Sequence, residues 1–407
     1  MAAASLEPET TIGAPSPRLA TLVMMASVGP LAMNIFVPSL PAMTHFFTTE
    51  YSVMQLMVSL YLVALAVAQL IIGPASDRFG RRPVLLASFI VFCIATLGSI
   101  FAPNVHTLLV WRVLQSASAA GLVLSRAIVR DTVDAEDAAS KIGYITMGMS
   151  LTPMVAPLIG GYLDEHYGWQ AGFWLCLTFG LVVLAFCWID LKETNLARAP
   201  SMTAQFAAWP QLFRAPRFWG YTATATFASG VFFAFLGGAP YISTEMLDMT
   251  PSQYGLHFGL VSLGYLIGNF LSGLYSKAWG MNRMMMLGNT ASLIGLLVSL
   301  GLFLAGYYHP LSLFLPSALV GVGNGMTLPS ANAGIVSVRP HLAGSASGLG
   351  GALTLGGGAV MAALASSLLG PTTGPFPMIY VCLVSALASI VATAFVLRRA
   401  AEVGELK

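Results

Sequence analysis

Long apolar runs alternate with short polar or glycine- and proline-rich breaks along almost the whole chain. Each run holds roughly 20 residues, which is the length that an α-helix needs to cross a bilayer. Because backbone groups in lipid must be satisfied within the segment, these runs predict helices rather than open strands. The pattern therefore predicts an all-α membrane protein with twelve transmembrane helices. Their expected ranges are 19–42, 51–72, 83–102, 107–128, 141–163, 170–190, 218–242, 252–275, 283–306, 311–334, 342–368 and 376–397.

The longest internal break divides the helices into two sets of six. Residues 191–217 are charged and contain no apolar span, so we interpret them as a cytoplasmic linker. The linker would join an N-terminal six-helix half, 19–190, to a C-terminal six-helix half, 218–399. Residues 1–18 are rich in Ala, Pro, Glu and Thr and lack the basic start of a signal peptide, which predicts a disordered cytoplasmic tail. Residues 400–407 form a second predicted cytoplasmic tail.

The composition is typical of a polytopic membrane protein and argues against several other classes. Of 407 residues, 57% are hydrophobic and 8% are charged, whereas soluble domains carry about 25% charged residues. No basic block suggests a nucleic-acid partner. No ATP-binding loop, metal-ligand cluster or nucleophile motif stands out, so we expect neither an enzyme nor an ATP-driven pump, and no cofactor or metal. The four cysteines lie apart within apolar runs, as reduced packing residues do.

Lysine and arginine residues gather on one side of the predicted topology. An even number of helices places both termini on that side, and no Lys or Arg falls in a loop on the other side. By the positive-inside rule, the basic side is cytoplasmic. Arg112 is the single basic residue within a predicted span. We therefore expect a multi-pass protein of a bacterial cytoplasmic (inner) membrane, with both termini in the cytoplasm.

A charged, glycine-bounded stretch between the second and third spans occurs twice. Residues 73–83 hold three arginines and Asp77, and a similar skeleton returns at 273–283 with Lys277 in place of the acid. The offset of about 200 residues indicates that a six-helix unit has been duplicated. Two such halves are related by an axis along the membrane normal, and a cavity between them is the expected substrate site.

The first copy matches the pattern G-x-x-x-D-R-x-G-R-R. It resembles the loop signature between the second and third helices of the major facilitator superfamily, and the twelve-span layout extends this resemblance over the whole chain. The resemblance implies that Asp77 binds the start of the eleventh span, 341–348, and thereby latches the cytoplasmic side shut. The alternative is a basic hairpin that only sets topology. Lys277 could not form the same latch.

The fifth span is rich in proline and glycine, which let helices bend and approach closely. It resembles the fifth-helix motif of drug-proton antiporters, although a pure packing role remains an alternative. Together with the charged turn, it supplies the expected gating residues. These are Gly73, Asp77, Arg78, Gly80, Arg81, Arg82, Arg126, Arg130, Pro153, Pro157, Gly160 and Gly161.

The fourth span carries Arg112 and, three residues later on the same helix face, Gln115. This pair resembles the R-x-x-Q motif of antiporters in the superfamily. A lone arginine at a helix centre costs about 2.5–3.5 kcal/mol or more, so it must face protein or water. A role in substrate or proton coupling competes with a structural role, in which Arg112 binds backbone carbonyls.

Three further segments, 34–41, 125–131 and 168–173, resemble the Bcr/CflA-like drug-resistance branch, whose exporters include ones for amphenicols and bicyclomycin. That branch usually has an acid at the position of Asn34, and no acid lies in the middle of any predicted span. A buried carboxylate is the usual proton carrier. The remaining proton-coupling candidates are therefore Arg112, Asp164, Glu245 and His257. The acids could equally be wet interfacial groups, and His257 a neutral hydrogen-bonded residue.

Without a fixed carboxylate opposite Arg112, the cavity would be neutral to positive and would disfavour lipophilic cations. Mostly apolar walls with a few polar groups suit amphipathic small molecules. Several of the expected lining residues could instead serve plain helix packing. They are Met33, Asn34, Gln55, Ser59, Arg112, Gln115, Met147, Ser150, Phe232, Phe235, Tyr265, Asn269 and Asn324.

These features predict a secondary active transporter that exports drugs or other small molecules by alternating access. We expect proton-coupled antiport of neutral or anionic amphipathic compounds, amphenicol-like drugs among them, and a role in antibiotic resistance. A metabolite exporter or an uncoupled facilitator is an alternative in the same class, and a ligand-binding membrane scaffold is one outside it. The expected partners are the lipid bilayer, a small-molecule substrate and protons, and the protein is expected to be a monomer.

Overall fold

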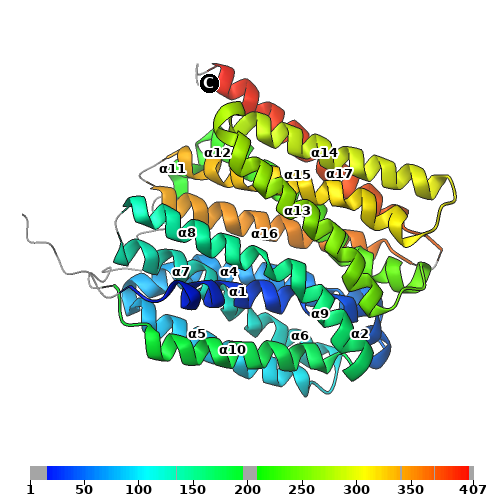
Figure 1. Ribbon diagram of the computed structural model, residues 1–407, viewed down its shortest axis with the longest axis horizontal. Coiled ribbons are helices and arrows are strands. Elements are labelled where there is room, and N and C mark those ends of the chain that lie inside the picture. Colours follow the sequence, from blue (N-terminus) through cyan, green and yellow to red (C-terminus); the bar gives the residue numbers. More distant parts are fainter. Residues whose placement is uncertain (1–15, 134, 196–208, 340–341, 371, 403–407) are drawn as a thin grey trace, which may run out of the picture.

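The computed structural model describes residues 16–133, 135–195, 209–339, 342–370 and 372–402 (Figure 1). Within these ranges, twelve helices are long and apolar enough to cross a membrane. They coincide with the twelve predicted spans, and the all-α prediction is confirmed. The predicted disordered tail lies almost entirely outside the described residues.

Several of the first six spans, here called the N-terminal half, consist of two or three shorter helices. The first span breaks after Asn34, and the fifth breaks at Leu151. Pro38 and Pro153 follow these breaks, and proline cannot donate the backbone hydrogen bond that would continue a helix. The elements are α1 (Leu19–Asn34), η1 (Val37–Ser39), α2 (Leu40–Phe46), α3 (Tyr51–Met54), α4 (Leu56–Phe79), α5 (Arg81–Ile100), α6 (Val105–Leu114), η2 (Gln115–Ser118), α7 (Ala119–Thr132), α8 (Ala135–Ser150), α9 (Thr152–Tyr167) and α10 (Gln170–Asp190).

The last six spans, here called the C-terminal half, are mostly continuous helices. A short helix, α11, precedes them, so the predicted linker 191–217 is not wholly without secondary structure. The elements are α11 (Trp209–Phe213), α12 (Pro216–Tyr241), η4 (Ile242–Met246), α13 (Pro251–Trp279), α14 (Met281–Leu304), α15 (Pro310–Ser337), α16 (Ala343–Ser367) and α17 (Phe376–Glu402). In Figure 1 the N-terminal half, blue to green, lies below the C-terminal half.

The stretch 73–83 is largely helical, which corrects the expectation that it forms a short turn between spans 51–72 and 83–102. Helix α4 continues to Phe79, and α5 begins at Arg81. The chain reverses at Gly80 alone, whose φ of 103° is open to glycine and strained for other residues. Gly280 repeats this geometry between α13 and α14 with a φ of 81°. The prediction failed because the charged residues before Gly80 form the last turn of a helix.

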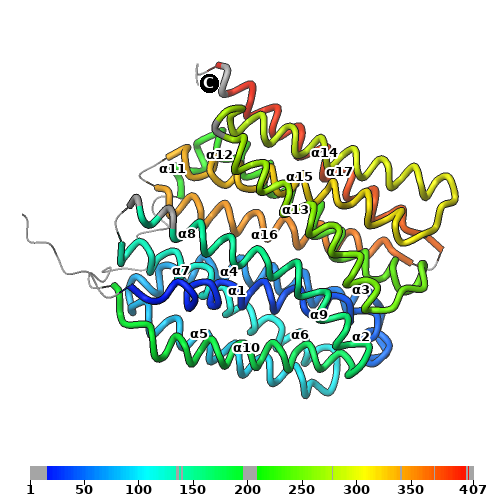
Figure 2. The backbone as a smooth tube through the Cα atoms, viewed as in Figure 1, coloured from blue at the N-terminus to red at the C-terminus, as the bar shows by residue number. Residues whose placement is uncertain are grey.

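The helices run between two ends of the molecule. The terminal end carries the Gly80 and Gly280 turns, and the first and last described helices α1 and α17 begin and end there, as the tube in Figure 2 shows. The far end carries the connections near Thr48, Gly168 and Asp248.

Hydrogen bonds join the two halves at the far end. The hydroxyl of Tyr51 donates to the carbonyl of Gly237 at 2.8 Å, and Ser366 donates to Gln55 at 3.0 Å. Helices α9 and α13 touch so closely there that a Cβ atom at Gly161 would collide with the carbonyl of Pro251. Small residues that let backbones approach are the main device of helix association in lipid.

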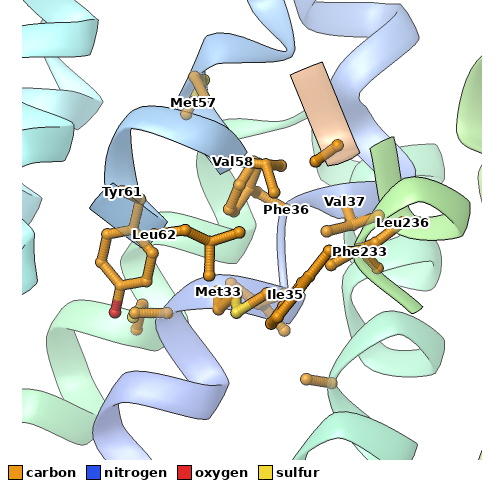
Figure 3. Packing of buried hydrophobic residues seen from close by; sticks show 14 of the residues in the cluster. Met33, Ile35, Phe36, Val37, Met57, Val58, Tyr61, Leu62, Phe233 and Leu236 are labelled. Atoms are coloured by element: carbon orange, nitrogen blue, oxygen red, sulfur yellow. The ribbon is translucent and has the colours of Figure 1, made fainter. Parts of the chain in front are cut away.

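The terminal end of α16 is far less enclosed. A Cβ atom added at Gly344 or at Gly348 would meet nothing within 4 Å. Between the two ends, apolar side chains of both halves form one cluster, in which Ile35 and Val37 lie beside Phe233 and Leu236 of α12 (Figure 3). The structure therefore shows a conformation in which the halves are closed together at the far end and in the middle.

Candidate functional site

Arg112 lies at the centre of the N-terminal half with no exposed surface. Its Nε donates to the carbonyl of Met57 at 3.0 Å, and its Nη1 donates to Oε1 of Gln115 at 2.7 Å. The guanidinium also lies 4.2 Å and 4.1 Å from the ring centroids of Phe36 and Tyr61. The sequence placed Gln115 on the same helix face as Arg112, and a bond to backbone carbonyls was one of the two alternatives for Arg112. The sequence did not predict the two aromatic rings, because they come from other spans with no spacing rule that links them.

The charge of Arg112 has no acidic partner within the described residues. The side-chain nitrogen Nε2 of Gln115 continues the network by donating to Oγ1 of Thr96 at 2.8 Å. Nη2 of Arg112 has no hydrogen-bond partner. A desolvated charge held only by neutral groups is costly, and such groups in membrane spans usually serve function. The core of the N-terminal half therefore holds the positive charge of Arg112, and Nη2 of this residue is a hydrogen-bond donor without a partner.

Other buried polar atoms without partners occur at the predicted substrate positions. Asn34, at the end of α1, donates to the carbonyl of Pro30 at 2.8 Å, but its Oδ1 has no partner. The hydroxyl of Ser59, Nε2 of Gln55 and both side-chain polar atoms of Asn324 likewise have none. Buried polar groups are normally satisfied, so these atoms are suited to bind water or the polar groups of a ligand.

The remaining predicted lining residues do not share one environment. Met33 and Phe235 are buried, whereas the side chain of Met147 is 61% exposed. Ser150 bonds back to its own helix at the carbonyl of Met147. Phe232 and Phe235 belong to an aromatic cluster of the C-terminal half with Phe258.

Two predicted lining residues of α13 also interact with each other. Tyr265 and Asn269 are half-buried, and Nδ2 of Asn269 donates to the carbonyl of Tyr265 at 2.8 Å. The structure therefore brings Arg112 and Gln115 into contact, and it pairs Tyr265 with Asn269. It does not show the thirteen residues as one continuous wall.

A cavity of about 310 Å³ lies elsewhere, between α1, α9 and α10. Its walls are apolar, and none of the predicted lining residues belongs to it. They are Ser27, Leu31, Leu151, Thr152, Val155, Ala156, Ile159, Leu175 and Phe179.

The proton-coupling candidates differ sharply in burial. Asp164 is 9% exposed, and Ser39 interacts with its carboxylate. Glu245 is exposed and pairs with His45 at 3.3 Å. The ring of His257 is half-buried and bonds the carbonyl of Gln253 at 2.8 Å.

At the Gly80 turn, the charged side chains bind within their own half. Arg81 pairs with Asp77 and, at 2.9 Å, with Asp131 of α7. The carboxylate of Glu193 accepts hydrogen bonds from the backbone N–H groups of Arg81 and Arg82, so the start of the linker is fixed to the turn. The sequence did not single out Glu193, although it is the first acid after the sixth span.

The described residues do not test the expected latch between Asp77 and the eleventh span. The segment 341–348 begins at His341, which lies outside the described residues, as does the side chain of Lys277. The latch stays a prediction for a state in which the terminal end is closed. Arg82 bonds the carbonyls of Leu191 and Trp188, while Arg78 and Arg130 are exposed and Arg126 is half-buried.

The proline- and glycine-rich motif forms α9 and packs on two partners. Pro153 stands in its first turn and Pro157 in its interior. A Cβ atom at Gly160 would collide with the carbonyl of Ile35 in the first span, and one at Gly161 with Pro251 of α13. The motif therefore sits between the first span and the opposite half, while its role in gating stays a prediction.

The fold and the buried site define a twelve-helix membrane transporter, and comparison with known proteins gives its family. The sequence profile of the Major Facilitator Superfamily matches residues 22–250 and 236–407. The chain belongs to this superfamily. It is 31% identical, over 84% of its length and 87% of the relative, to the uncharacterized MFS-type transporter YdgK of Bacillus subtilis.

Other relatives are named for drug resistance. A chloramphenicol resistance protein of Pseudomonas aeruginosa is 29% identical over 90% of this chain and 86% of its own length. Multidrug resistance protein D of Escherichia coli is 28% identical over 88% and 89%. These relatives confirm the resemblance to the Bcr/CflA-like drug-resistance branch.

A solved structure supports the fold independently. The human organic anion transporter MFSD10 matches with a TM-score of 0.70 and 17% identity, covering 93% of this chain and 98% of that one. Such a low identity carries information on the fold alone. Together the findings imply a multi-pass transporter of a bacterial inner membrane.

Proposed function

We propose that this protein is a proton-coupled exporter of neutral or anionic amphipathic compounds, amphenicol-like drugs among them. The observation that carries the proposal is the fully buried Arg112, for which the described residues provide no acidic partner. The drug-resistance names of several relatives support an export role.

Charge explains the expected selectivity. A fixed cation in a low-dielectric site repels other cations and attracts anions or electronegative groups. Asn34 lies in the first span, where an acid would offset that field, and it adds no charge. Nη2 of Arg112 and Oδ1 of Asn34 are a donor and an acceptor without partners, which suits a neutral ligand with polar groups.

Alternating access follows from the arrangement of the halves. We infer that 19–190 and 218–399 move as two units joined by the linker 191–217. The far-end contacts described above would be present when the terminal end is open, and the Asp77 latch would form when it is closed. Because basic residues gather at the terminal end, we assign it to the cytoplasm, with the transporter acting as a monomer.

The test is transport by purified protein in liposomes with an acidic lumen. Labelled chloramphenicol should accumulate in the lumen as protons leave, and a protonophore should abolish the accumulation. A quaternary ammonium dye of similar size should not accumulate. Drug flux indifferent to the pH gradient would remove proton coupling, and transport of the dye without transport of chloramphenicol would overturn the proposed substrate class.

The neutral Asn34 favours one second candidate, an uncoupled facilitator. With no acid in the middle of the first span, a proton has no carrier beside the substrate site. In that case chloramphenicol would equilibrate across the same liposomes at any pH gradient, without proton movement.

A further inference from the structure

We propose that Asp164 is a proton-binding site whose occupancy is linked to closure of the far end. This inference rests on the proposed alternating access and names a regulation of it. Arg112 and Asp164 are the two charged residues that are buried within the described part of the chain. Asp164 is therefore the one acid there that the fold largely removes from water.

Helix geometry places Asp164 on the face of α9 that packs against the first span and against α13. Residues three and four apart lie on one helix face, so Asp164 follows both Gly160 and Gly161 on α9. Gly160 packs on the carbonyl of Ile35, and Gly161 packs on Pro251 of α13. The carboxylate thus lies between the first span and the opposite half.

No described cation balances this carboxylate. Ser39, at the end of η1, interacts with it, and the ion pairs of the structure do not include it. The other described acids at the far end, Glu50, Glu165, Glu245 and Asp248, are exposed. Glu245 pairs with His45, and the exposed Glu165 accepts from the backbone N–H of Ser252.

The other titratable groups around α9 are occupied elsewhere. His166, on α9 itself, bonds the carbonyl of Tyr162, and His257, on α13, bonds that of Gln253. His45 of α2 is paired with Glu245 as described. Glu165, the adjacent acid on α9, is exposed. Burial without a cation favours the neutral carboxylic acid.

Closure of the far end is therefore coupled to the binding of one proton by Asp164. When α9 and α13 separate, water of the far compartment reaches Asp164 and the carboxylate ionises, releasing its proton to that water. When the helices come together, the carboxylate takes a proton from the same compartment and is buried as the acid. Because the closed state binds one more proton, the closed-to-open ratio rises up to tenfold for each unit that the far-side pH falls.

The site also contacts the break in the first span. Ser39, which meets Asp164, ends the short η1 segment, and Phe36, which lies over Arg112, precedes it. The two buried charges thus flank the same broken segment, so a change at Asp164 reaches the surroundings of Arg112 through three residues of chain. An acidic far compartment would return the empty carrier to the state that is open at the terminal end.

A distance measurement tests the proposal without any substrate. Spin labels at Tyr167→Cys on α9 and Leu256→Cys on α13 replace exposed residues, and the four native cysteines are buried. Between pH 8 and pH 5 the short-distance population should grow in the otherwise unaltered protein. Asp164→Asn, which mimics the neutral acid, should hold the short distance at every pH.

Matched variants separate Asp164 from its neighbours. Glu165→Gln, on the adjacent exposed acid, should keep the full pH response, and so should His45→Gln, which removes a group that titrates near neutrality. Asp164→Glu should keep a response with a shifted midpoint, which covers the case in which Asp164→Asn does not fold. A normal pH response in Asp164→Asn, or its loss in Glu165→Gln, would overturn the proposal. Either result would leave the liposome test of drug transport unaffected.

Discussion

The cores of the two halves both contain buried polar groups, but among the described residues only the N-terminal core holds a buried arginine. In the C-terminal half, Thr327 donates to Asn289 at 3.3 Å, and Asn289 donates to Thr393 at 3.0 Å. Thr393 in turn lies 3.3 Å from Thr224, which ties α12, α14, α15 and α17 together with neutral groups. The N-terminal half instead buries the charged Arg112. The cores of the two halves thus differ in electrostatic character.

The helices of the two halves also differ in continuity. The first, fourth and fifth spans of the N-terminal half are broken, whereas α13, α14, α15 and α16 run uninterrupted. In the C-terminal half, Gly264 and Gly268 of α13 lie directly on the backbone of α15, so these helices have little freedom to bend. We call the C-terminal half, with its neutral core and uninterrupted helices, the scaffold half. The N-terminal half carries the buried charge and the broken helices.

The largest expected effect is that of removing the buried charge. Arg112→Met should lower chloramphenicol transport on the order of 100-fold, because a charged hydrogen bond contributes up to about 3 kcal/mol and 1.4 kcal/mol corresponds to tenfold. Thermal stability should be unchanged or higher, since an apolar residue of similar size relieves a costly burial. Liposome transport and thermal unfolding measure the two effects.

The matched change in the scaffold half should behave in the opposite way. Asn289→Ala removes two buried hydrogen bonds, to Thr327 and Thr393, which should cost about 1–3 kcal/mol of stability, while transport per folded molecule is retained. Normal transport by Arg112→Met would contradict the proposed difference in role between the two halves. So would loss of transport by a well-folded Asn289→Ala protein.

A second prediction tests the rigidity of the scaffold half within one helix. Gly268→Ala would drive its Cβ atom into the backbone of Val322 and should destabilise the protein by about 1–3 kcal/mol, as overpacking does. Gly259→Ala, also in α13, meets nothing within 4 Å and should leave the unfolding temperature unchanged or slightly raised. Equal unfolding temperatures for the two variants would contradict close backbone packing at this site.

The smallest expected effect concerns an added acid. Asn34→Asp should raise transport of a lipophilic cation about tenfold, because a charge pair at an effective dielectric of about 20 supplies more than the 1.4 kcal/mol required. Asn324→Asp, the same change at a buried asparagine of the scaffold half, serves as the control. A gain in cation transport from the control alone would reverse the assignment of roles to the halves.

The sequence predicts the twelve spans well because bilayer thickness sets their length. It also predicts contacts within one helix, such as that of Arg112 with Gln115, because helix geometry fixes which residues share a face. It does not predict Phe36 and Tyr61 beside Arg112, since packing of separate spans brings these rings together. The helical residues before Gly80 were missed for a related reason, because charge there indicates a loop while the backbone continues as helix.

The latch at Asp77 illustrates a different limit. A motif names the residue, but its partner depends on which end of the transporter is closed. In this conformation Asp77 pairs with Arg81 of its own half. Burial, which singles out Asp164 among the acids, is likewise a property of the assembled helices and of one conformation.

The central claim, that the buried charge of Arg112 selects the substrate, is tested most directly by competition. Liposome transport of labelled chloramphenicol would be measured against three unlabelled amphipathic competitors of similar size, one neutral, one anionic and one cationic. The account predicts inhibition by the neutral and anionic compounds and little by the cation, with this discrimination lost in Arg112→Met. Strongest inhibition by the cation in the unaltered protein would contradict the account.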